Sequence, residues 1–133
     1  MGRDAAQIRA ASFRSKRLPK FLRYLEHNLE RNDATVFVGD RVTYVDLAAF
    51  QVVEGLSYAF PRTFKKLHGE VPRLLDLHAR IGDRPRIATY LESDRRYPFS
   101  DQGIFRKYPE LDVAPTKKKP RPKAKRAKAR TRR

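Results

Sequence analysis

Three histidines, with serines and carboxylates scattered around them, are the residues of this sequence that could catalyse a reaction or bind a metal ion. His27, His68 and His78 do not have the spacing of a recognisable metal-ligand set. The sequence has no Gly-x-Ser-x-Gly turn to present a nucleophilic serine, and no glycine-rich phosphate loop. It also lacks cysteine, which excludes thiolate nucleophiles, thiolate metal ligands and disulfides. We therefore predict no catalytic residue and no metal site in this sequence.

Thr43 and Asp46 have the spacing of a capping box at the start of a helix. The threonine hydroxyl can accept a hydrogen bond from the backbone N–H three residues on, and the aspartate can accept one from the N–H of Thr43. The residues that follow, as far as Phe60, are almost all apolar, and a helix that is apolar all round is expected to be buried all round. We predict a structural role for the pair, as the cap of a central helix.

The elements around this central helix are also predicted to be helical. One apolar stripe recurs at three- and four-residue spacing through Leu18, Phe21, Leu22, Leu25 and Leu29, with Lys20, Arg23, Glu26 and Glu30 on the opposite face. Shorter helices are predicted over residues 62–70, 71–83 and 84–93, and residues 34–42 are predicted to be an extended link. The aromatic residues of 94–112 indicate an irregular segment that lies across the body. The predicted fold class is an all-α helical bundle.

Positive charge is concentrated at the C-terminal end. The chain of 133 residues has 31 Lys and Arg against 15 Asp and Glu, and 11 of the basic residues lie in residues 116–133, which contain no acid. This Lys/Arg/Pro/Ala-rich composition predicts a disordered tail over residues 113–133. Such a tail attracts polyanions without reading sequence, since it contains no aromatic residue. The predicted polyanion-binding residues are Lys117, Lys118, Lys119, Arg121, Lys123, Lys125 and Arg126. The alternative is a tail that only improves solubility.

The composition also bears on location. No apolar run approaches the roughly 18 residues of a membrane span, and the first residues lack the apolar core of a secretory signal. The absence of cysteine fits a reducing compartment. We expect a cytoplasmic protein with no membrane span.

Three stretches, in this order, resemble the all-helical C-terminal domain of glutathione transferases: residues 18–32, 36–56 and 71–93. The most specific element is the Thr43 and Asp46 cap, which opens a buried helix directly after a Val-Gly-Asp turn. The resemblance covers roughly residues 12 to 112. It implies a helical domain over residues 17–112, with residues 1–16 as the remnant of a first long helix and residues 113–133 as the tail.

Full members of that family begin with a thioredoxin-like domain, which binds glutathione and activates its thiol. The C-terminal domain supplies the wall for the electrophilic substrate and part of the dimer contact. Since this sequence has no βαβ pattern, the resemblance implies a truncated or split transferase that is inactive as this chain alone. Glutathione would be the cofactor of the full-length family and would not be bound by this chain alone. The implied partner is a thioredoxin-like domain or a second copy of the chain.

The same resemblance implies a pocket for an apolar substrate, lined by Phe13, Phe99, Phe105 and Tyr108. The alternative for these four residues is that they cover the hydrophobic core. A second hypothesis for the whole chain belongs to another class of protein. In it, the chain is a non-catalytic helical binding module, and the basic tail holds it on nucleic acid without sequence preference.

Overall fold

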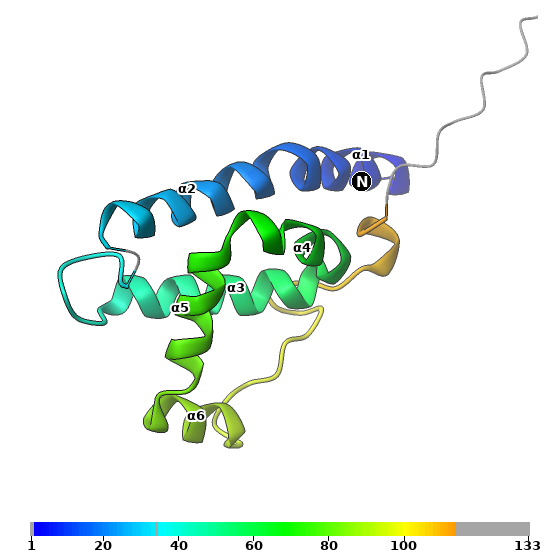
Figure 1. The fold of residues 1–133 in the computed structure, drawn as a ribbon. Helices are drawn as coiled ribbons and strands as arrows, with labels where there is room; N and C mark the ends of the chain where they lie inside the picture. Colours follow the sequence, from blue (N-terminus) through cyan, green and yellow to red (C-terminus); the bar gives the residue numbers. More distant parts are fainter. Residues whose placement is uncertain (1, 34, 114–133) are drawn as a thin grey trace, which may run out of the picture.

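The computed structural model describes residues 2–33 and 35–113, and these residues form helices and loops without a β-strand (Figure 1). This confirms the predicted all-α fold class. Within the same residues, no helix is long and apolar enough to cross a membrane. The predicted disorder of the basic tail concerns residues that, from 114 onward, lie outside the described part of the chain.

The first helix is longer than the apolar stripe predicts. Helix α1 (Arg3–Ser12) continues through a π-helical turn (Phe13–Arg17) into helix α2 (Leu18–Arg31) without a break. In the wide turn the N–H of Leu18 bonds to the carbonyl of Phe13. Pro19 explains the turn, because proline has no N–H for the ordinary helical bond and its ring needs room beside the preceding turn. The expected boundary between residues 16 and 17 falls inside this turn, and the domain limits stay a prediction.

The link after α2 is fixed by one buried carboxylate. Helix α3 (Tyr44–Ala59) begins with a reciprocal cap, in which the hydroxyl of Thr43 accepts from the N–H of Val45 at 3.3 Å and Asp46 accepts from the N–H of Thr43 at 2.7 Å. The other oxygen of Asp46 accepts from the N–H of Phe37 at 2.9 Å. Asp46 is completely buried. It therefore holds both the start of α3 and the extended link that precedes it.

The prediction that α3 is buried on all sides is wrong. Phe50 and Val53 are buried, but Tyr44 is 82% exposed, Leu47 43% and Val52 37%. Helices α4 (Pro61–Leu67) and α5 (Pro72–Gly82) pack against the other side of α3, and the described residues leave these three side chains exposed. The apolar composition of α3 therefore reflects a buried face and, opposite it, an exposed apolar face.

The core lies where α5 packs against both α2 and α3 (Figure 1). Its fully buried side chains include Leu18, Leu22 and Leu29 of α2, Val53 of α3, and Leu74, Leu77 and Ile81 of α5. A 3₁₀ turn (His68–Glu70) joins α4 to α5, and helix α6 (Pro85–Glu92) follows α5. Helices α4, α5 and α6 all begin with Pro-Arg, which fits the helix start because proline needs no N–H partner there.

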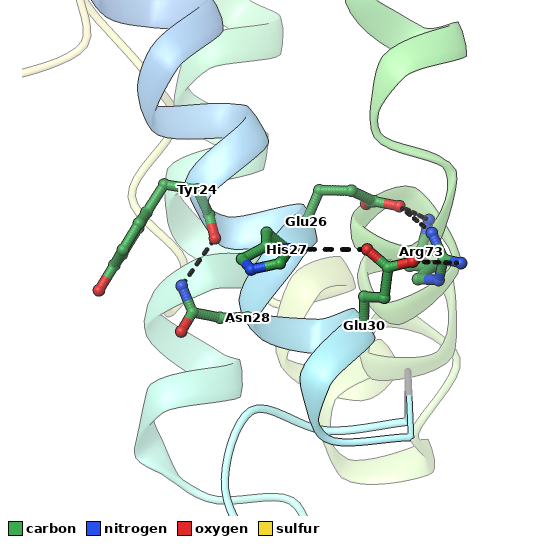
Figure 2. Close-up of polar contacts among 6 residues, drawn as sticks. All are labelled: Tyr24, Glu26, His27, Asn28, Glu30 and Arg73. Atoms are coloured by element: carbon green, nitrogen blue, oxygen red, sulfur yellow. Dashed lines mark hydrogen bonds and ion pairs between the residues drawn. The ribbon is translucent and has the colours of Figure 1, made fainter.

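The start of α5 is capped by a residue of α2. The carboxylate of Glu26 accepts from the N–H groups of Arg73 at 3.0 Å and Leu74 at 2.8 Å, and the Arg73 side chain also reaches Glu26 and Glu30 (Figure 2). The prediction that Glu26 faces away from the apolar stripe is wrong, since Glu26 is 7% exposed whereas Phe21 is 50% exposed. The buried face of α2 therefore includes Glu26, because its carboxylate accepts hydrogen bonds from the start of α5.

The start of α4 is capped from the far end of the described chain. After α6, residues 93–113 run back along the body to the α1 end of the molecule, where a 3₁₀ turn (Pro109–Leu111) contacts α1 (Figure 1). Buried Asp112 then accepts from the N–H groups of Arg62 at 2.7 Å and Thr63 at 3.1 Å, and from the Thr63 hydroxyl at 2.5 Å. The irregular aromatic segment thus lies across the body as predicted and is fastened at its end.

Replacing Thr43 tests the local cap of α3. Thr43→Ala removes the hydroxyl that accepts from Val45 and should lower the free energy of unfolding by about 0.5–2 kcal/mol. Thr43→Ser keeps the hydroxyl and is the matched control, which should unfold close to wild type. Urea melts of the three proteins measure the difference. Equal destabilisation by both substitutions would mean that the threonine methyl group, and not the cap, is what matters.

Candidate functional site

Phe99 and Phe105, two of the four aromatic residues expected to line a pocket, belong to the segment after α6 and pack together against α3. The ring of Phe99 stacks on Tyr58, with 5.1 Å between centroids, and meets Phe105 edge-on at 5.9 Å. Phe105 lies directly over Gly55, where any Cβ atom would overlap the ring. The C-terminal segment therefore depends on a glycine in the middle of α3 to dock its aromatic residues.

The other two aromatic residues lie elsewhere. Phe13, in the π-helical turn, packs against Phe60 at the end of α3, with 5.3 Å between ring centroids, and borders the core. Tyr108 lines a separate groove beside α1, together with Gln7 and Leu111. The structure thus brings Phe99 and Phe105 together and places Phe13 and Tyr108 at two further sites.

An aromatic groove of about 420 Å³ lies between α3, α6 and the segment that follows α6. Its apolar lining comes from Leu47, Phe50, Ile87, Tyr90, Leu91, Tyr97 and Phe99, and Gln51 and Arg96 add polar groups. A lining of this kind suits an apolar ligand that carries a few polar groups. Of the four predicted pocket residues, Phe99 alone lines this groove, and the other lining residues were not predicted as site residues.

Next to the aromatic groove, the side chains of Glu54, His78 and Arg96 form a cluster of ion pairs. Glu54 on α3 pairs with His78 Nε2 at 2.8 Å and with Arg96 Nη2 at 2.7 Å, one partner on each carboxylate oxygen. The His78 ring stacks on Phe50 with 4.7 Å between centroids, and the Arg96 guanidinium lies 5.6 Å from the centre of the Phe99 ring. Glu54 therefore joins α3, α5 and the segment after α6, and it holds Arg96 and Phe99 in place.

The environment of Glu54 favours its charged form. Burial raises the pKa of Glu54, but the hydrogen bonds and charges of Arg96 and His78 outweigh burial, so the pKa lies below its ordinary value. Glu54 is thus an ionised partner that fixes Arg96, and the charge of Arg96 is neutralised by Glu54. The cluster positions the groove wall; it does not present a free acid or base to it.

The three histidines lie apart from one another. His27 Nδ1 lies 3.6 Å from a carboxylate oxygen of Glu30. The His68 ring meets the Phe64 ring edge-on, and His78 belongs to the Glu54 cluster. In residues 2–33 and 35–113 no group of His, Cys, Asp and Glu is arranged to hold a metal ion.

The remaining predicted residues lie outside the aromatic groove. The predicted polyanion-binding residues, Lys117 to Arg126, lie outside the described residues. Thr43 and Asp46 form the cap of α3 described above.

Comparison with known proteins identifies the family. The family described as "Glutathione S-transferase, C-terminal domain" matches residues 2–94, which is more than half of the chain. The chain therefore belongs to the glutathione S-transferase family, and the resemblance predicted from its sequence is confirmed. A glutathione S-transferase of Plasmodium yoelii yoelii is 33% identical over 81 residues, which are 60% of this chain and 36% of that protein. The match thus spans about a third of the length of this relative.

Replacing Glu54 with glutamine tests the support of the groove through pH. Because the folded state lowers the pKa of Glu54, its contribution to stability should be fully present above the ordinary carboxyl pKa of about 4.3. It should be lost as the pH falls through the lower, folded value. The gap in unfolding free energy between wild type and Glu54→Gln should therefore shrink as the pH falls below about 4.

Urea titrations between about pH 3 and 7 measure this gap. The control is Glu92→Gln, on an exposed residue of α6 for which no ion pair is found in the described part of the chain, and it should follow the wild-type curve. A constant gap for Glu54→Gln down to pH 3 would contradict the assigned role of Glu54.

Proposed function

We propose that this chain supplies the electrophile-side helical domain of a glutathione transferase, and that glutathione binding and thiol activation come from a thioredoxin-like domain. The observation that supports this is the family match over residues 2–94. The aromatic groove is the candidate wall for an apolar electrophile, because it is mostly apolar and is bordered by Phe99. The proposal includes a cytoplasmic location, which the cysteine-free sequence favours.

The chain on its own is proposed to be inactive toward glutathione. Lowering the barrier for attack by a thiol requires a group that binds and ionises it. Arg96 is the cation that lines the aromatic groove, and its guanidinium is already paired with Glu54 at 2.7 Å. A thiolate in this groove would have to compete with that carboxylate. We therefore assign the chain a role in binding the electrophile and in contacting a partner.

The proposed partner contact is the exposed apolar side of α3. Tyr44, Leu47 and Val52 are the exposed large apolar side chains of α3, and they lie on the side of the helix away from the core. Exposed apolar surface of this kind is typical of an interaction site. Its proposed partner is a thioredoxin-like domain or a second copy of this chain.

A second candidate function is nucleic-acid binding through the basic tail of residues 116–133. One observation in the described part favours it, namely a group of cations close to Val113, where the described chain ends. A helical module held on nucleic acid would need no glutathione chemistry. The two candidates therefore differ in what the purified chain should do with a thiol and with a polyanion.

The purified 133-residue chain should conjugate glutathione to an aryl halide no faster than buffer does, because the groove offers no free group to ionise the thiol. A two-domain glutathione transferase in the same spectrophotometric assay is the positive control. Turnover that saturates with glutathione would contradict the proposal that a second domain is required.

A further inference from the structure

A second groove, of about 820 Å³, lies between the first long helix and α4. Arg14 of the π-helical turn lines one side, and Arg62, Lys65 and Lys66 of α4 line the other. We refer to the surface formed by these four cations as the basic groove. Asp112 is the one carboxylate among the lining residues, so the groove carries a net charge of +3.

The carboxylate in the basic groove is already fully engaged. Asp112 is buried and accepts three hydrogen bonds, two from the backbone N–H groups of Arg62 and Thr63 at the start of α4 and one from the Thr63 hydroxyl. The helix start is therefore occupied, and it is the side chains of α4 that remain available to an anion. Asp112 does not form a salt bridge with any of the four cations.

The cations of the basic groove lack carboxylate partners within residues 2–33 and 35–113. None of the ion pairs found there involves Arg14, Arg62, Lys65 or Lys66. The Nε atom of Arg14 is buried and has no hydrogen-bond acceptor. By contrast, Arg23, Arg73, Arg80 and Arg96 are all paired with acids. These four cations, none of which has a carboxylate partner among the described residues, come from two segments and lie at one hollow surface.

The positive charge and the lining residues of the basic groove indicate which kind of ligand it could bind. Four cations on two facing walls suit several phosphates carried on one backbone, as in nucleic acid. No aromatic side chain of the described residues lines the groove, so bases cannot stack there, and this disfavours a single strand. Val113 lines the same groove, and the sequence soon adds 11 further Lys and Arg residues with no acid and no aromatic residue. Both features favour a duplex contacted through its phosphates.

We propose that the basic groove between the π-helical turn and α4 binds the phosphate backbone of duplex nucleic acid without sequence preference. The site consists of Arg14, Arg62, Lys65 and Lys66 in the folded domain. It goes beyond the tail candidate, because it assigns binding to folded residues that act whether or not the tail contributes.

The test compares two triple variants of the full chain that lose the same charge. The groove variant carries Arg62→Gln, Lys65→Gln and Lys66→Gln, and the control variant carries Arg84→Gln, Arg86→Gln and Arg95→Gln. The control arginines are exposed, lie around α6, and have no ion pair among the described residues. Both variants keep the tail. Fluorescence anisotropy measures binding to a labelled DNA duplex of mixed sequence over a series of salt concentrations.

The groove variant should bind at least about tenfold more weakly than wild type near 0.1 M salt, and its log–log salt dependence should be shallower by about 0.9 for each phosphate that the protein no longer neutralises. The control variant should keep nearly the wild-type slope. Thermal melts check that each variant is folded. If the groove triple does not fold, the pair Lys65→Gln and Lys66→Gln is compared with Arg84→Gln and Arg86→Gln, with the same direction expected.

Equal affinity and slope for the groove and control variants would overturn the proposal. So would tighter binding to a single strand of the same sequence, or binding to anionic lipid vesicles in place of the duplex. A chain without residues 116–133 tests the tail separately. Loss of binding on that deletion, with no effect of the groove variant, would support the tail candidate and reject the groove.

Discussion

The described structure depends on buried carboxylates that accept hydrogen bonds at helix starts. Glu26 and Asp112 accept from the first N–H groups of α5 and α4, and Asp46 accepts from the N-cap residue Thr43 and from Phe37 in the link before α3. Asp46, Glu26 and Asp112 are the buried charged residues of the described chain, and they serve α3, α5 and α4 respectively. The first N–H groups of a helix have no partner within it, and a buried carboxylate without donors is costly, so each group satisfies the other. Glu26 and Asp112 also join segments that are distant in sequence, and they therefore fix how α2 and the C-terminal segment pack.

The sequence predicted the caps only where the partners are neighbours. Thr43 and Asp46 are three residues apart, so their cap is visible as a pattern. Glu26 and Leu74 are 48 residues apart, and Arg62 and Asp112 are 50 apart, so no local pattern links them. For this reason the prediction from the apolar stripe put Glu26 on the wrong face of α2. The prediction that α3 is buried on all sides was wrong for a related reason, since composition does not show which neighbours cover a helix. One signal was available: Pro-Arg follows apolar Phe60 and Val71, neither of which can cap a helix.

The candidate sites follow from these constraints. The aromatic segment after α6 is positioned at one end by the Glu54 cluster, in its middle by Phe105 on Gly55, and at its far end by Asp112. This path separates the four aromatic residues expected in one pocket, and it produces the aromatic groove near α6 and the basic groove near α4. Family membership and the helical fold could be predicted from local motifs. The two grooves could not, because each gathers residues from segments far apart in the sequence.

Amide hydrogen exchange of the native chain, read residue by residue, tests the role of the buried caps most directly. Arg62, Arg73 and Arg86 each follow the proline that begins a helix, so they hold equivalent positions in α4, α5 and α6. The N–H groups of Arg62 and Arg73 bond to Asp112 and Glu26, whereas among the described residues no side chain accepts from the N–H of Arg86. We predict slow exchange at Arg62 and Arg73 and fast exchange at Arg86. Exchange at all three positions as fast as in an unfolded peptide would contradict the role assigned to the buried carboxylates.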